Sequence, residues 1–195
     1  MTIAPIPRIT PLTKPAGIAP PGSFSTTIVL NLGIETISEF FGSNLASQLL
    51  KERGYPKLII ANNVLAHSDS LRDIFEGISL LMNLESTAVI EFSYVVDVFE
   101  KLLFDTIYHE HTSYHSIAPL QKFLKLFGLL IFDVERFDAH GGSARVYIKK
   151  FEGSQPVVDS VQSAIDYENT IGIHDAETWQ DFNSRIAQLS LMLNN

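Results

Sequence analysis

The chain has 195 residues, of which 46% are hydrophobic and none is cysteine, and its formal net charge is −8. This length and hydrophobicity are enough for one buried core, so wholesale disorder is excluded. The lack of cysteine excludes disulfides and thiolate metal sites, and the acidic balance gives no electrostatic footprint for nucleic acid or an anionic membrane. The sequence shows neither a long apolar run nor a secretion signal, so we expect a cytoplasmic protein.

Proline marks the first segment of the chain. Six of the nine prolines fall within the first 21 residues, so residues 1–25 are expected to form a disordered, proline-rich leader. A partial α/β domain is expected over residues 26–150, beginning with one or two short strands in 26–37. Residues 151–195 are expected to form a linker and helices, which would be the start of a truncated C-terminal domain.

From residue 42 onward, strand-like apolar runs alternate with amphipathic helical patterns. This alternation is typical of a parallel sheet with crossover helices, and therefore of the α/β class. Helices are expected at 42–53, 71–82, 94–103 and 116–127, and buried strands at 57–61 and 87–92. Two further strands, at 128–137 and 144–149, flank a His-Gly-Gly turn and predict an antiparallel pair.

Polar clusters follow the predicted strands at 62–67, 104–115 and 140–143, and these clusters contain five of the six histidines. In an open α/β sheet, ligands bind outside the carboxyl ends of the strands. Histidine is the usual general base, because its unperturbed pKa lies nearest neutrality. The clusters therefore indicate a catalytic or binding site, although the third can equally be a tight turn that requires positive φ.

The individual side chains leave alternatives open. His67 can equally be a hydrogen-bonded structural histidine. If residues 108–113 were extended, His109 and His111 would share a face, as a metal site requires, but a His-x-His pair without a third ligand is a weak signal and no metal is predicted. A base beside a carboxylate is favoured, with Glu110 orienting an imidazole and Tyr108 donating to a developing oxyanion.

Four motifs occur in order along the chain: Glu39-Phe-Phe-Gly42, Asn62-Asn-Val-Leu-Ala-His67, Phe104-Asp-Thr-Ile-Tyr-His-Glu-His-Thr-Ser-Tyr114 and His140-Gly-Gly-Ser-Ala-Arg-Val-Tyr147. With these motifs, residues 35–150 resemble the S-adenosylmethionine-dependent sugar C-methyltransferases, which act on nucleotide-linked keto-deoxysugars. The Tyr-His-Glu-His block is the most specific part of the resemblance. It implies a partial Rossmann-like, class I methyltransferase sheet with flanking helices.

The resemblance also implies a reaction and its residues. In the family, a base removes the proton next to the sugar ketone, and the enolate then attacks the sulfonium methyl group. Carried onto this sequence, the catalytic residues would be His111 as the base with Tyr108, Glu110 and His67. The cofactor-binding residues would be Glu39, Phe40, Ala61 and Asn62, and the substrate-binding residues would be His109, Tyr114, His140 and Ser143.

The sequence departs from the family's pattern before residue 35. The family's glycine-rich cofactor loop, its ribose-binding acidic residue and its cysteine-rich zinc region have no counterpart here. Two central strands would then be missing, and a second copy or a partner chain would be needed to cover the exposed sheet. Besides an active methyltransferase, the sequence therefore allows an inactive fragment of one or a non-catalytic module that binds a sugar nucleotide.

Overall fold

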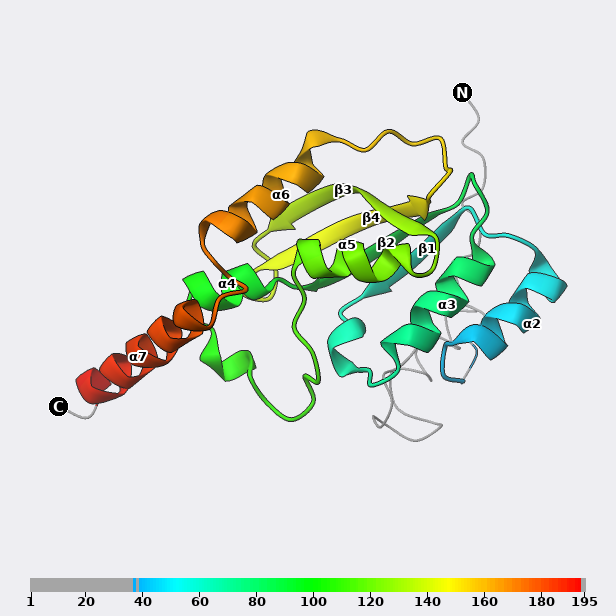
Figure 1. The fold of residues 1–195 in the computed structure, drawn as a ribbon. Coiled ribbons are helices and arrows are strands. Elements are labelled where there is room, and N and C mark those ends of the chain that lie inside the picture. Colours follow the sequence, from blue (N-terminus) through cyan, green and yellow to red (C-terminus); the bar gives the residue numbers. More distant parts are fainter. Residues whose placement is uncertain (1–36, 38, 194–195) are drawn as a thin grey trace, which may run out of the picture.

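The computed structural model describes residue 37 and residues 39–193 (Figure 1). The expected leader at 1–25 and all but residue 37 of the strands expected at 26–37 lie outside this part. The helices and strands are α2 (Ser43–Arg53), β1 (Leu58–Asn62), α3 (Leu71–Leu81), β2 (Thr87–Ser93), α4 (Val95–Glu100), α5 (Ile117–Lys125), β3 (Leu129–Phe137), β4 (Ser143–Lys150), α6 (Asp159–Thr170) and α7 (Ala176–Leu193), with short 3-10 turns at Leu65–His67 and Phe104–Thr106.

The elements predicted from periodicity are confirmed in kind and order, although several end a few residues earlier than expected. The helix predicted at 94–103 is the shortest, with six residues in α4. Gly54 ends α2 with φ of 74°, a left-handed conformation that glycine adopts without steric strain.

The sheet is mixed, with strand order β1-β2-β4-β3. β1 and β2 are parallel neighbours, and β4 runs antiparallel to both β2 and β3. The predicted α/β class and the antiparallel final pair are therefore confirmed. Because β1 and β2 pair directly, a further strand cannot lie between them and could add only at an outer edge of this sheet. Their carboxyl ends lie side by side, and the first polar cluster begins at the carboxyl end of β1.

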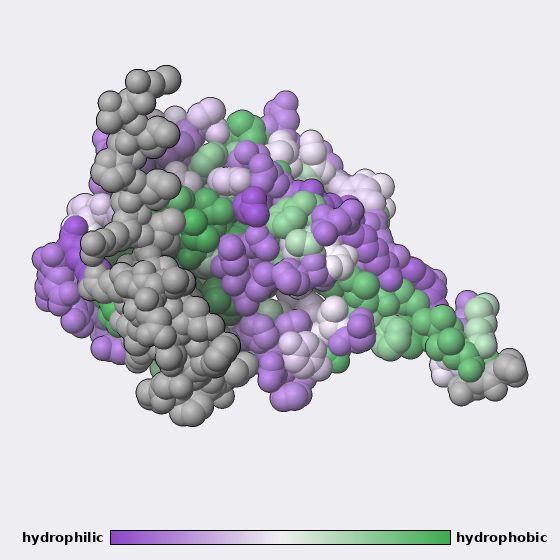
Figure 2. Space-filling view, turned by 180° about the vertical axis from the view of Figure 1, so that it is seen from behind, coloured by the Kyte–Doolittle hydropathy of each residue, from purple (hydrophilic) through white to green (hydrophobic). Residues whose placement is uncertain are grey.

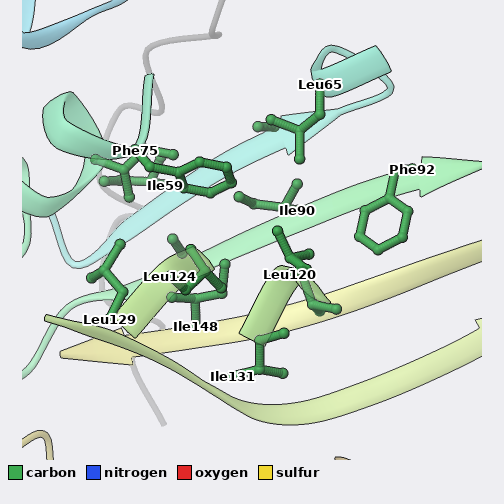
Figure 3. Packing of buried hydrophobic residues seen from close by; sticks show 14 of the residues in the cluster. Ile59, Leu65, Phe75, Ile90, Phe92, Leu120, Leu124, Leu129, Ile131 and Ile148 are labelled. Atoms are coloured by element: carbon green, nitrogen blue, oxygen red, sulfur yellow. The ribbon is translucent and has the colours of Figure 1, made fainter. Parts of the chain in front are cut away.

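One face of the sheet carries the hydrophobic core. Ile90 on β2 and Ile148 on β4 are fully buried against Phe75 of α3 and Leu124 of α5 (Figure 3). These apolar side chains alternate along each strand with residues of the opposite face, as the two-residue repeat of a strand requires. The helices α3 and α5 thus fix the strands whose ends bear the candidate site.

The opposite face of the sheet is more open and more polar. Along β2, Val89 is half-buried, and Glu91 lies next on that face. Seen from this side, the surface mixes apolar and polar residues (Figure 2). At the carboxyl end of β1 and β2, Glu91 pairs with Arg145 of β4, with 3.0 Å between carboxylate and guanidinium. This ion pair lies beside the first polar cluster.

The last two helices follow the sheet. α6 packs along β3 and α5, and α7 extends away from the sheet (Figure 1). Phe182 is the buried residue of α7, and its ring packs against Phe99 of α4 at 6.2 Å between centroids. The far end of α7 is apolar and exposed at Leu191, Met192 and Leu193. Over the described residues, no helix is long and apolar enough to span a membrane.

Candidate functional site

The three polar clusters converge at the carboxyl ends of β1 and β2. The first two are joined by backbone hydrogen bonds, because Thr112 N donates to Ala66 O at 2.7 Å. The second and third meet at Tyr94, which directly follows β2: its amide donates to Gly142 O at 3.3 Å, and it forms a parallel bridge with His115. The sequence placed each cluster after a strand, and the fold brings them together.

Aromatic and imidazole rings form the centre of the site. The ring centroids of His67 and His111 lie 4.8 Å apart, and those of Tyr108 and His111 lie 4.4 Å apart. The segment turns at this point, with His111 N donating to Tyr108 O at 3.0 Å. An extended segment would instead have placed His109 and His111 on one face, whereas this turn brings the Tyr108 ring against the His111 ring at an interplanar angle of 46°.

Backbone carbonyls set the tautomers of both central histidines. His67 Nδ1 lies 3.0 Å from Glu110 O, and His111 Nδ1 lies 2.8 Å from Thr106 O. A carbonyl oxygen only accepts, so each neutral ring carries its proton on Nδ1 and its lone pair on Nε2. Among residues 39–193, neither Nε2 has a hydrogen-bond partner. The sequence had assigned the orienting role to the Glu110 carboxylate, but its backbone carbonyl makes this contact. A partly exposed imidazole with a free Nε2 is equipped to accept a proton.

The two tyrosines of the second cluster differ in their hydrogen bonds. The Tyr114 hydroxyl donates to Thr106 O at 3.0 Å, and burial raises the pKa of Tyr114, so this group stays protonated and holds the turn. Tyr108 is 42% exposed, and within residues 39–193 its hydroxyl has no hydrogen-bond partner. Tyr108 is therefore the tyrosine whose hydroxyl is free to contact a ligand.

The segment with Glu39 and Phe40 lies just before α2, and both side chains are exposed, Phe40 by 66%. Close packing fixes the residues that follow. A Cβ on Gly42 would lie 1.9 Å from Asp73 Oδ2 of α3, and Ser43 N donates to Asp73 Oδ1 at 3.0 Å. Hydrogen bonds from the Ser43 hydroxyl and amide lower the pKa of Asp73, which therefore stays ionised. The exposed Phe40 thus directly precedes a closely packed segment.

The end of β1 supplies the other predicted cofactor residues. Ala61 is buried, whereas Asn62 is exposed. The next residue, Asn63, adopts φ of 52° and its amide donates to Glu91 O at 2.7 Å, which ties the end of β1 to β2. Glu91 and its partner Arg145 were not singled out by the sequence. Because 54 residues separate Glu91 from Arg145, no local sequence pattern indicates that they form an ion pair.

The third cluster is a tight turn between β3 and β4, as one of its two interpretations predicted. His140, Gly141 and Gly142 all have positive φ, and a Cβ on Gly142 would lie 2.2 Å from Asp97 Cγ. His140 is exposed, but Ser143 is fully buried and its hydroxyl donates to Ala139 O at 3.1 Å. The Ser143 hydroxyl therefore stabilises the turn, and the substrate contacts predicted for this cluster remain predictions.

The other histidines of the second cluster take different positions. His109 is exposed, with its ring centroid 5.9 Å from that of Tyr108. His115 is buried, which lowers its pKa to about 4, and its Nε2 lies 3.2 Å from Ser113 Oγ. Within the described part of the chain, no three histidine and carboxylate side chains lie together as a metal site would need.

The fold and the site together define an α/β protein with a histidine-lined site at the carboxyl ends of two parallel strands. Sequence comparison adds two likenesses to known proteins. Residues 138–195 match the family model of the C-methyltransferase C-terminal domain. Over 150 residues, 77% of the chain, the sequence is 29% identical to the C-methyltransferase NovU of Streptomyces niveus. The chain is thus similar to C-methyltransferases, and it covers 36% of the length of that relative.

Solved structures give weaker likenesses. One is an O-methyltransferase of neocarzinostatin biosynthesis in complex with S-adenosylmethionine, with a TM-score of 0.46, 13% identity and coverage of 67% of this chain and 38% of that one. Another is magnesium protoporphyrin IX methyltransferase from Synechocystis PCC 6803 with bound SAH, with a TM-score of 0.38, 18% identity and coverage of 65% and 56%.

Proposed function

We propose that the chain is the base-bearing part of an S-adenosylmethionine-dependent C-methyltransferase that acts on a nucleotide-linked keto-deoxysugar. The observation that carries the proposal is the His111 ring, whose Nδ1 is held by the Thr106 carbonyl at 2.8 Å, so that Nε2 is free to accept a proton. Similarity to a C-methyltransferase over 77% of the chain supports the same reaction class.

The proposed chemistry starts with proton transfer. His111 Nε2 takes the proton from the carbon next to the sugar ketone, and the electrons of that C–H bond move into an enolate. Tyr108, whose ring lies beside the His111 ring, donates a hydrogen bond from its hydroxyl to the enolate oxygen, which makes a proton α to a ketone accessible to an imidazole base. When bound, S-adenosylmethionine would supply the electrophilic methyl group for the new C–C bond, and S-adenosylhomocysteine would leave with the electrons of the broken S–CH₃ bond.

The residues assigned to the cofactor fit such a molecule in part. Phe40 offers an exposed ring on which an adenine could stack, next to the exposed Glu39. At the end of β1, Asn62 is exposed and offers amide donors and acceptors, while its neighbour Ala61 is buried. These groups would orient the donor, and the base would come from the second cluster.

The test separates proton removal from methyl transfer. The full chain is incubated in D₂O with a nucleotide-linked keto-deoxysugar, and NMR follows deuterium uptake at the carbon next to the ketone. We expect His111→Gln to slow this exchange at least about 100-fold, the usual contribution of a general base. Asp105→Asn, at an exposed position in the same motif, is the matched control and should retain the rate.

Two outcomes would contradict parts of the proposal. Equal exchange by the unaltered chain and His111→Gln would remove His111 as the base. Sugar-nucleotide binding without any exchange would favour the non-catalytic module, which the lack of a glycine-rich loop in the sequence also favours. A calorimetric titration with S-adenosylmethionine tests the cofactor separately, and a Kd near the micromolar range, about −8 kcal/mol, is expected.

A further inference from the structure

Glu168 is a fully buried carboxylate on α6, far in sequence from the candidate site. Its Oε1 accepts hydrogen bonds from the Tyr94 hydroxyl at 2.8 Å and from Ile117 N at 2.5 Å, and its Oε2 accepts one from Ala118 N at 3.0 Å. His174 Nε2 lies 3.6 Å from the same Oε2. Burying a carboxylate is unfavourable unless its oxygens are hydrogen-bonded, and here the N-terminus of α5 adds favourable dipole charge.

The groups that Glu168 binds belong to the anchor of the histidine-bearing segment. Ile117 and Ala118 begin α5, directly after residues 104–116, which carry Tyr108 and His111. Tyr94 follows β2 and bridges to His115 near the end of the same segment. Burial and the adjacent Glu168 carboxylate raise the pKa of Tyr94, so its hydroxyl stays protonated and donates.

We propose that Glu168 is a positioning residue: through Tyr94 and the first turn of α5, it holds the segment that presents His111. The region matched by the C-terminal domain model thereby contributes to the geometry of the site at the sheet. The effect on catalysis rests on the proposed function, whereas the effect on the segment does not.

Substitution of Glu168 should loosen the segment without exposing the core. In Glu168→Gln one carboxylate oxygen becomes an NH₂ group, so at least one of the three donors faces another donor and the negative charge at α5 is lost. Glu168→Asp keeps the charge on a shorter side chain and should recover part of the effect. Asp166→Asn removes a charge from an exposed position on the same helix and is the matched control.

The measurement is backbone amide hydrogen exchange of the full chain, followed by NMR. In Glu168→Gln we expect exchange at His111 and Thr112 to become at least tenfold faster, along with Ile117 and Ala118. Asn63, whose amide bonds to Glu91 O at 2.7 Å in the sheet, should not change. Glu168→Asp should give a smaller acceleration at the same amides, and Asp166→Asn none. If Glu168→Gln does not fold, the proposal is tested by comparing amide exchange in Glu168→Asp with that in Asp166→Asn and in the unaltered chain.

The pattern of exchange distinguishes positioning from general stability. Acceleration confined to Ile117 and Ala118, or equal acceleration that includes Asn63, would overturn the proposal. This readout needs no substrate, so it stands even if the proposed methyl transfer fails. Where deuterium exchange into the sugar is observed, Glu168→Gln should lower kcat by tenfold or more with little change in KM, and an equal loss by Asp166→Asn would also overturn it.

Discussion

The buried imidazole of His115 predicts that the chain loses stability in mild acid. The ring lies edge-on to Phe92, with centroids 5.4 Å apart, and its Nε2 faces the Ser113 hydroxyl at 3.2 Å. Burial lowers the pKa of His115 from its ordinary value of 6.5 to about 4. The folded protein therefore keeps this ring neutral at pH values where the unfolded chain protonates it.

The size of the effect follows from proton linkage. Between pH 6.5 and 4 the unfolded state binds more protons than the folded state, so the free energy of unfolding decreases as the pH falls through this window. A difference of about 2.5 pKa units corresponds to about 3 kcal/mol over the whole window. Between pH 7 and pH 4.5 the contribution of His115 alone is about 2.4 kcal/mol.

Urea unfolding at pH 7 and pH 4.5 tests this prediction, with His115→Gln compared to the unaltered chain. The variant should lose about 2 kcal/mol less stability between the two pH values, because carboxylates that titrate in both proteins cancel in the difference. His109→Gln removes an exposed histidine and should behave like the unaltered chain. If His115→Gln shows the same pH dependence as the unaltered chain, or NMR titration places the pKa of His115 near 6.5, the reasoning fails.

Two further predictions concern the turn and the cofactor side. Gly142→Ala should lower the free energy of unfolding by more than about 2 kcal/mol, because its φ is 141° and the new Cβ would lie 2.2 Å from Asp97 Cγ. Gly54 also has positive φ, but a Cβ there would meet no other atom within 4 Å. In the same urea assay, Gly54→Ala should therefore lower the free energy of unfolding by only about 1 kcal/mol. Equal losses in the two variants would show that the contact with Asp97 is not the cause. Phe40→Ala should weaken S-adenosylmethionine binding about tenfold, typical of a lost stacking contact, without changing Tm, and unchanged calorimetric affinity would remove Phe40 from the cofactor site.

The elements could be predicted from the sequence because their signals are local. Hydrophobic spacing predicted α3 and the buried strands, and a glycine after each periodic run marked where α2 and the α5 region end. The site was predicted only as far as its clusters. Whether Glu110 orients a histidine through its carboxylate or its carbonyl depends on the turn at 108–111, and the hydrogen bonds of the Glu168 carboxylate span 50 to 74 residues. Neither the carbonyl contact of Glu110 nor the hydrogen bonds of Glu168 can be predicted from a local sequence pattern.

The hydrogen bonds of the second cluster divide its side chains into two groups. Tyr114 and His115 are committed to the fold, the former by its bond to Thr106 O at 3.0 Å and the latter by burial. Within residues 39–193, the Tyr108 hydroxyl and the Glu110 carboxylate have no hydrogen-bonded or ionic partner, and both residues lie in the same turn as His111. If the fold required only the backbone at positions 108, 110 and 111, many other side chains would be tolerated at these three positions. The proton acceptor His111 Nε2, the donor hydroxyl of Tyr108 and the carboxylate of Glu110 are therefore the groups of this cluster that remain available to a bound ligand.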